Sequence, residues 1–182
     1  MTWIAALALL AAPDDDLPRE LGQDAGEKNF SFGFRLGVVE APDADDATWT
    51  AAIALRWGLG PLFAVELSGA YYRTDFEDED ADVRVIPVQA SLLLSPLQGR
   101  VRPFALAGVG LIFIDADFDG VLAPLGHETD TEFGAHLGLG LDLELGREAF
   151  LSGDARWNFY GDLEEDDLDF LQVTVGIYFR FS

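Results

Sequence analysis

The chain has 182 residues, 49% of them hydrophobic, and its 33 acidic and 11 basic side chains give a net charge of -22. This charge would repel the phosphates of nucleic acid, so we expect no nucleic-acid partner. The absence of cysteine excludes disulfides, thiolate metal sites and lipid-anchored cysteines. No apolar run reaches the ~18 to 20 residues that a membrane-spanning helix needs.

The first residues carry an apolar stretch, Trp3 to Ala12, which is followed by three aspartates. Such a stretch is typical of the centre of a secretory signal. Because no Lys or Arg precedes it and Pro13 follows it at once, a short buried helix or strand, or a true start upstream of Met1, stays open as an alternative. We interpret residues 1–12 as a signal segment, 13–28 as a polar leader and 29–182 as the folded domain.

From Phe30 onward the chain alternates between apolar and polar or small residues with a period of two, which predicts β-strands. The expected strands are residues 30–38, 48–59, 63–71, 86–94, 101–119, 133–145, 151–159 and 171–182. The last one is typical, because Val173, Val175 and Ile177 share one face while Thr174 and Gly176 lie on the other. The fifth is apolar on both faces, and Pro87 is uncomfortable in the fourth because it has no N–H to donate.

The connectors between these strands are alternately long and short. The long, acidic ones are residues 40–47, 74–82, 115–131 and 161–169, and the short ones are residues 58–61, 95–100 and 146–149. Eight strands joined in this way predict an all-β fold, an antiparallel up-and-down barrel that closes by pairing its first and last strands. Closure also protects the apolar terminal strand from edge-to-edge association.

The two faces of the strands predict which side meets the solvent. The polar face carries many glycines, which suit a crowded interior. The other face carries more aromatic volume than a narrow lumen can hold. Its aromatic residues are Phe30, Phe32, Phe34, Trp49, Trp57, Phe63, Tyr71, Phe133, Trp157, Phe159, Phe179 and Phe181. We therefore predict a transmembrane barrel in the bacterial outer membrane, with residues 75–82 and 162–169 outside the cell and 96–100 in the periplasm.

Two segments resemble a known family. The terminal YFRF, with the alternation before it and Gly176, and the segment RPFALAGVGL are similar to those of small OmpA-type, opacity-porin-like outer-membrane barrels. The resemblance covers roughly residues 29–182, although Ser182 follows the terminal aromatic residue on which family members typically end. It implies insertion by the outer-membrane assembly machinery and supplies no activity.

A barrel hydrolase would need a nucleophile, a base and an acid in contact. His136 lies on the polar face with Asp142, Glu144 and Asp154, and Ser152 is the nearest hydroxyl in a neighbouring strand. No G-x-S-x-G motif is present, and residues 136 and 142 lie about 20 Å apart along an extended strand. We therefore interpret His136 as structural, and predict no catalytic residue and no enzyme.

The inward-facing charges have both signs, which predicts an ion-pair network that plugs the lumen. They are Arg35, Arg56, Glu66, Asp142, Glu144, Asp154, Arg156 and Arg180. Eight strands leave an interior just wide enough for side chains, so a wide pore is not expected. A passage for hydrophobic ligands stays open as an alternative, with Leu62, Val85, Leu93 and Val109 as its apolar inward candidates.

The stretch DADFDG, residues 115–120, matches the first half of a calcium loop. Asp115, Asp117 and Asp119 are the candidate ligands for weak calcium or magnesium binding. The glutamate expected at the twelfth position is Gly126, so a strand whose polar face continues into an acidic loop is the simpler interpretation.

These patterns predict an integral outer-membrane barrel with a structural or surface-interaction role. Its partners would be outer-membrane lipid, the assembly machinery and an unidentified ligand of the loops. We expect it to act as a monomer without a cofactor beyond the weakly bound cation. A narrow channel for small solutes or hydrophobic ligands is the alternative, and a lipid-modifying hydrolase is less favoured.

Overall fold

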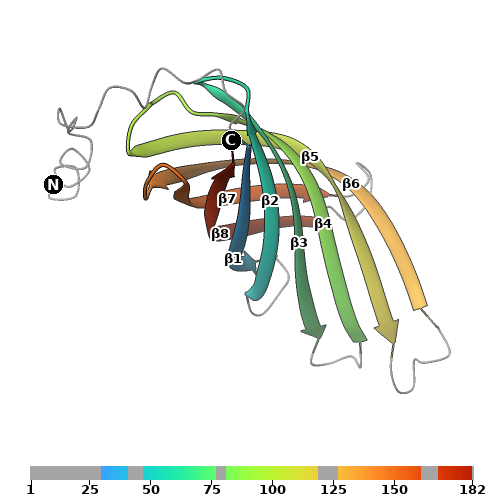
Figure 1. Ribbon diagram of the computed structural model, residues 1–182. Coiled ribbons are helices and arrows are strands. Elements are labelled where there is room, and N and C mark those ends of the chain that lie inside the picture. Colours follow the sequence, from blue (N-terminus) through green and yellow to red (C-terminus); the bar gives the residue numbers. More distant parts are fainter. Residues whose placement is uncertain (1–29, 41–46, 77–80, 119–126, 161–167, 182) are drawn as a thin grey trace, which may run out of the picture.

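The computed structural model describes residues 30–40, 47–76, 81–118, 127–160 and 168–181. They form a closed barrel of eight antiparallel strands, each hydrogen-bonded to its neighbours in the chain (Figure 1). The strands are β1 (Phe30–Glu40), β2 (Thr48–Gly58), β3 (Phe63–Phe76), β4 (Ala81–Leu94), β5 (Val101–Phe118), β6 (His127–Glu144), β7 (Ala149–Tyr160) and β8 (Leu168–Phe181). In this part of the chain, no helix is long and apolar enough to cross a bilayer. The predicted all-β fold is confirmed.

The barrel closes between its first and last strands. The β1–β8 ladder is continuous from Phe30, opposite Phe181, to Glu40, opposite Leu171. The apolar C-terminal strand therefore has no open edge, because β7 pairs with its other side. Residues 59–62, 95–100 and 145–148 form the short turns, and we call the end of the barrel that carries them the turn end. The opposite end is the loop end.

The strands on one side of the barrel run farther toward the loop end than the alternation predicts. β5 and β6 each have 18 residues, whereas β1 and β2 have 11, and β3 to β6 extend visibly beyond the others (Figure 1). The expected loops 74–82 and 115–131 are therefore too long, because backbone pairing continues through polar residues such as Asp75, opposite Asp82. Hydrogen bonding between strands needs no apolar face, so hydropathy marks only part of each strand.

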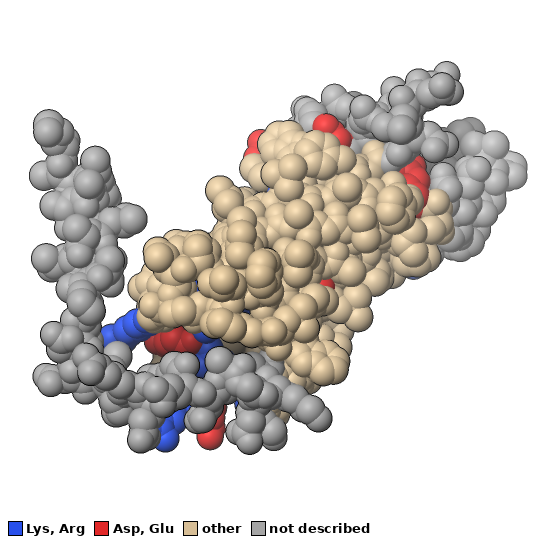
Figure 2. All heavy atoms as spheres, turned by 90° about the horizontal axis from the view of Figure 1, so that it is seen from above, with Lys and Arg blue, Asp and Glu red and all other residues tan. Residues whose placement is uncertain are grey.

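The outer face of the barrel is apolar, as predicted. Side chains such as Trp49, Leu139 and Val175 are 77%, 70% and 60% exposed, which a water-soluble surface would rarely combine. Figure 2 shows a broad band of mostly uncharged residues, with Arg side chains visible only at one end. This surface fits the hydrocarbon of a bilayer.

The structure orients β5, which its sequence left open. Phe104, Leu106 and Ile112 point inward and are buried, whereas Val109 is 48% exposed on the outer face. The inward candidates Val109 and Leu62 are therefore wrong, since Leu62 lies exposed in the β2–β3 turn. The β3–β4 ladder skips the pairs between Gly69–Val88 and Tyr72–Val85, where Pro87 has no N–H to contribute.

Candidate functional site: a filled lumen

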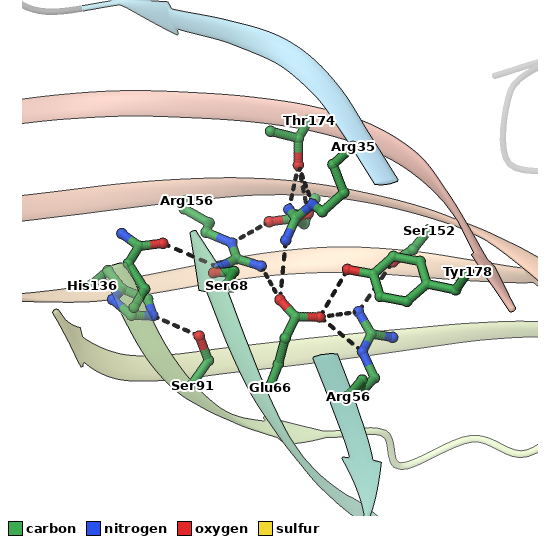
Figure 3. A network of polar contacts seen from close by, with 12 residues as sticks. Arg35, Arg56, Glu66, Ser68, Ser91, His136, Ser152, Arg156, Thr174 and Tyr178 are labelled. Carbon is green, nitrogen blue, oxygen red and sulfur yellow. Dashed lines mark hydrogen bonds and ion pairs between the residues drawn. The ribbon is translucent and has the colours of Figure 1, made fainter. Parts of the chain in front are cut away.

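Six charged side chains meet in the middle of the lumen, and we call them the ion-pair centre (Figure 3 shows most of them). They are Arg35 on β1, Arg56 on β2, Glu66 on β3, Asp142 on β6, and Asp154 and Arg156 on β7. Three arginines face three carboxylates, so the formal charge of the centre is balanced. All six side chains are buried, and the desolvation of these charges is tolerated because each has an oppositely charged partner.

Glu66 is the hub of this centre. Its Oε1 accepts hydrogen bonds from Arg35 Nη1 at 3.0 Å and Arg156 Nη2 at 2.5 Å. Its Oε2 accepts from Arg56 Nη2 at 2.8 Å and from the Tyr178 hydroxyl at 2.9 Å. Its relative exposure is 0%. One carboxylate therefore neutralises part of the charge on three strands and fixes the position of an aromatic ring.

The two aspartates complete the centre. Arg56 Nη1 donates to both carboxylate oxygens of Asp142 at 3.0 and 2.9 Å. Asp154 accepts from Arg156 Nε at 2.5 Å and also from Arg35. Thr174 donates to Asp154 at 2.9 Å. The expected network is confirmed for these residues, and the two outer members of the predicted set, Glu144 and Arg180, pair with each other near the turn end.

An aromatic layer lies on the turn-end side of the ion-pair centre. The rings of Phe150 and Tyr178 stack at 5.0 Å between centroids. The guanidinium of Arg56 lies 4.6 Å from the centroid of Tyr178 and 5.2 Å from that of Phe104. Cation–π contacts of this kind hold the charge where water is excluded. The layer thus joins the charged centre to the apolar wall.

Glycines on the inner face make room for this layer. A Cβ on Gly33 would lie 2.6 Å from Tyr178, and one on Gly140 would lie 2.3 Å from the Phe104 ring. Both distances are far below van der Waals contact. At Gly33 and Gly140, a ring from another strand therefore occupies the space that a side chain would need.

An apolar cluster fills the lumen on the loop-end side of the centre. Its members are Val39, Tyr72, Val85, Ile112, Tyr160 and Phe170, with Ile114 packed against them. Tyr160 and Phe170 stack at 5.8 Å, and Gln89 donates to the Tyr160 hydroxyl at 3.0 Å. Gln89 also donates to Asn158 at 2.6 Å and accepts from Arg156 at 3.2 Å, so polar contacts connect the cluster to the ion-pair centre.

His136 does not belong to a catalytic triad. Its Nε2 lies 2.8 Å from Ser91 Oγ on β4, a contact that passes over Gly108 on β5. Its Nδ1 has no hydrogen-bond partner within the described residues, although a triad would place a carboxylate there. Ser152, the hydroxyl expected near it, instead accepts a hydrogen bond from Arg56 at 3.3 Å. Asp142, Asp154 and Glu144 are paired with arginines.

The candidate cation ligands lie at the loop end. Asp115 and Asp117 belong to β5, opposite Thr129 and His127 of β6, so they are strand residues. Asp119 lies outside the described residues. The calcium-loop geometry is therefore wrong for the first two aspartates, while binding of a cation stays a prediction. Among the side chains that the structure describes, no group of three or more acidic or histidine residues could hold a metal.

Sequence reasoning missed some members of the site. Tyr178 and Ser91 lie on faces that the alternation marks as inward, but their partners are not on adjacent strands. Tyr178 contacts Glu66 three strands away around the barrel, and Ser91 contacts His136 two strands away. Phe104 was hidden by the double apolar pattern of β5. Only the register and the strand order bring these residues together.

A closed eight-stranded barrel with an apolar belt and a charged, filled lumen defines the class of small outer-membrane barrels. The sequence comparisons agree. A family model described as the outer membrane protein beta-barrel domain matches residues 3–181, so the chain belongs to this family and is a protein of the bacterial outer membrane. No curated protein sequence matches the chain.

Several solved barrels share the fold. Neisserial surface protein A is 13% identical, with a TM-score of 0.66 over 85% of this chain and 97% of its own. The attachment invasion locus protein Ail of Yersinia pestis, in complex with the heparin analogue sucrose octasulfate, is 17% identical, with a TM-score of 0.58 over 85% and 97%. The outer membrane enzyme PagL is 14% identical, with a TM-score of 0.52 over 81% and 97%. The fold thus accommodates both surface proteins and an enzyme.

Proposed function

We propose that this protein is a closed outer-membrane scaffold that presents acidic loops to partners at the cell surface. The observation that carries the proposal is the filled lumen. Glu66 and Tyr178 are 0% exposed and Arg156 is 1% exposed, although a water-filled passage would wet the side chains that line it. The alternative of a hydrophobic passage is disfavoured, because Val85 and Leu93 are packed in apolar clusters.

Electrical recording tests the closed lumen. The purified barrel, inserted into planar bilayers, should give no stepwise conductance. A matched variant in which Phe104 and Tyr178 are both alanine should open water-filled space beside the ion-pair centre and raise the frequency of conducting events. Regular conductance steps from the unmodified protein would instead support the narrow-channel alternative.

The orientation of the barrel follows from the same proposal, with the loop end outside the cell and the turn end in the periplasm. Because the chain has no cysteine, single cysteines can be placed at will. A cysteine at position 165 on intact cells should react with a membrane-impermeant thiol reagent, and one at position 97 should react only after the outer membrane is opened. The reverse pattern would overturn the topology.

The charge of the loops supports a cationic partner. Thirteen acidic residues lie in 41–46, 77–80, 119–126 and 161–167, and these segments contain no Lys or Arg. Ail binds a heparin analogue, which is a polyanion. The acidic loops of this chain have the same sign of charge as such a ligand and would repel it, so the proposed partner is a basic peptide or protein surface.

A binding experiment separates the two kinds of partner. The barrel in nanodiscs should bind hexalysine, and sucrose octasulfate should not bind at the loop end. In the variant E164Q/E165Q/D166N/D167N, the affinity for hexalysine should fall several-fold, and the difference should shrink in high salt. Equal binding of hexalysine by both proteins would show that the loops do not recognise the cation.

Weak binding of calcium or magnesium at the loop end remains a second proposal. Its support is the register, which places Asp117 directly opposite Asp82, and Asp82 directly opposite Asp75. A dissociation constant of about 0.1 to 1 mM is expected, as in extracellular calcium modules. Calorimetry with the unmodified chain and with D117N/D119N decides: identical heats of binding would rule out Asp117 and Asp119 as ligands.

The proposal also holds that the barrel is not an enzyme. His136 is 2% exposed inside the lumen, where a lipid substrate does not reach it, and its Nδ1 lacks an acid. Since PagL shows that this fold can carry an activity, the point needs a direct test. Incubation with outer-membrane lipid should release no fatty acid detectable by mass spectrometry. Release that disappears in H136A would overturn it.

A further inference from the structure

Positive charge gathers around the turn end of the lumen, in an arrangement we call the basic mouth. It consists of Arg100, Arg102, Arg147 and Arg180, together with the carboxylates Glu144 and Glu148. Four cations thus face two anions. Figure 2 shows Arg side chains, with acidic ones beside them, at one end of the molecule.

The inner part of the basic mouth is held by ion pairs and ring contacts and is partly enclosed. Glu144 accepts hydrogen bonds from Arg180, with Nη1 at 2.8 Å, and pairs with Arg102 Nη2 at 2.6 Å. The Arg180 guanidinium lies 4.8 Å from the centroid of Phe150, and that of Arg102 lies 5.8 Å from it. The two arginines share Glu144 and the Phe150 ring, and Arg102 Nη2 also lies 3.9 Å from a carboxylate oxygen of Asp142. The Arg102 Nε is buried without an acceptor among the described residues.

The outer part of the basic mouth carries positive charge that Glu144 does not neutralise. Arg100 and Arg147 are exposed in the β4–β5 and β6–β7 turns, and neither forms an ion pair with any residue that the structure describes. The mouth as a whole has a surplus of guanidinium groups over carboxylates. Such a surplus attracts an anionic ligand whose charges are spaced along a chain.

The chain carries an anionic segment that is tethered to this mouth. The leader, residues 13–28, contains six carboxylates, one arginine and one lysine. The segment leads into β1, and Ser31, near the beginning of β1, lies directly opposite Arg180 of β8. A short tether raises the effective concentration of a ligand to the millimolar range, so weak ion pairs suffice for binding.

We propose that the acidic leader, residues 13–28, binds the basic mouth of its own barrel through ion pairs with the exposed arginines and with Arg102. The occupant is this segment because it is opposite in charge and is joined to the strand beside the mouth. The inference does not depend on the surface role proposed above, since it concerns the other end of the barrel.

Distance measurement between two spin labels tests the proposal. In the otherwise cysteine-free chain, L17C and L97C place one label in the leader and one in the exposed β4–β5 turn. In uncharged detergent at 50 mM NaCl, the distance distribution should contain a narrow, short component. At 1 M NaCl, where the screening length falls to about 3 Å, most of this component should be lost.

Two variants keep the test independent of folding. D14N/D15N/D16N changes the leader alone, and R100Q/R147Q changes exposed turn residues outside the ion-pair centre; each should reduce the short component to less than half. Loss of the component only when anionic phospholipid is added would mean that lipid phosphate displaces the leader, which still requires the leader to bind first. A distribution that is equally broad in all proteins and at both salt concentrations would overturn the proposal.

Discussion

The two faces of each strand obey different rules. On the outer face, residues such as Leu137, Leu139 and Leu141 of β6 need only be apolar, because lipid hydrocarbon makes no directional contacts. On the inner face of the same strand, His136, Asp142 and Glu144 each contact particular residues of other strands. The outer face is therefore tolerant of exchange among apolar residues, whereas the inner face depends on individual partners.

This difference has an energetic counterpart. On the outer face, removing one apolar side chain costs the free energy of transferring that side chain into lipid hydrocarbon. Removing one member of the ion-pair centre leaves its partners charged, buried and unpaired, which costs more than the pair itself contributes. Substitutions that alter the two faces by similar chemistry should therefore differ in their effect on unfolding.

The largest effect is expected for Glu66→Gln. The change preserves the shape of the side chain but removes the charge that three arginines share, so the free energy of unfolding should fall by about 3 to 5 kcal/mol. Urea unfolding of the barrel in phospholipid vesicles measures it. Glu144→Gln is the matched control, because its side chain is 21% exposed at the mouth and water can compensate. Equal losses in the two variants would contradict the role of Glu66 as the hub.

The outer face should reject charge according to depth. Leu139→Arg, at a position 70% exposed to the bilayer, should lower the free energy of unfolding by about 2 to 4 kcal/mol if it lies near the membrane centre. Leu143→Arg lies on the same strand and face but close to the turn end, so its cost should be about 0 to 1 kcal/mol. An equal cost at both positions, measured in the same vesicles, would argue against a membrane around this face.

The inward Gly138 is not a suitable control for that experiment. An added Cβ there would lie 2.3 Å from the carbonyl oxygen of Ala155, so any side chain disrupts the β6–β7 ladder whatever its charge. The sequence marks Gly138 as inward, but it does not show how close the neighbouring backbone comes.

The outer face could be predicted because its rule is local. A period of two in hydropathy is enough to assign Val173, Val175 and the other apolar positions of β8, and the alternation of connectors gives the strand order. The hydropathy signal ends where the membrane ends, which is why the strand residues Asp75 and Asp130 were expected in loops.

The sequence predicts which charged residues lie on the inner face, but it does not predict which of them pair. The charged members of the ion-pair centre were identified from the alternation, since charges inside a narrow barrel must pair. That Glu66 contacts Arg156, 90 residues away, depends on the closed strand order and the register. The contact between Ser91 and His136 depends in addition on the missing side chain of Gly108.

A smaller effect is expected where the lumen is crowded without charge. In Gly140→Ala the new methyl group would meet the Phe104 ring at 2.3 Å and the Gly153 carbonyl oxygen at 2.6 Å, so the free energy of unfolding should fall by about 1 to 3 kcal/mol. Gly146→Ala in the β6–β7 turn has no atom within 4 Å of the new Cβ and should cost less. If the turn variant is the more destabilised one in urea unfolding, the glycines do not serve to make room for the aromatic layer.

The smallest effect should come from Ser91→Ala, which removes one neutral hydrogen bond from the inner face. The Ser91 hydroxyl lies 2.8 Å from His136 Nε2, and a hydrogen bond between neutral groups contributes about 0.5 to 1.5 kcal/mol. Because the His136 Nδ1 already lacks a partner in the described residues, the loss leaves the ring with no polar contact at either nitrogen. A double-mutant cycle with His136→Leu measures the coupling between the two residues. A coupling free energy near zero would mean that His136 is held by packing alone. In that case only the charged residues of the inner face would contribute polar contacts that matter for stability.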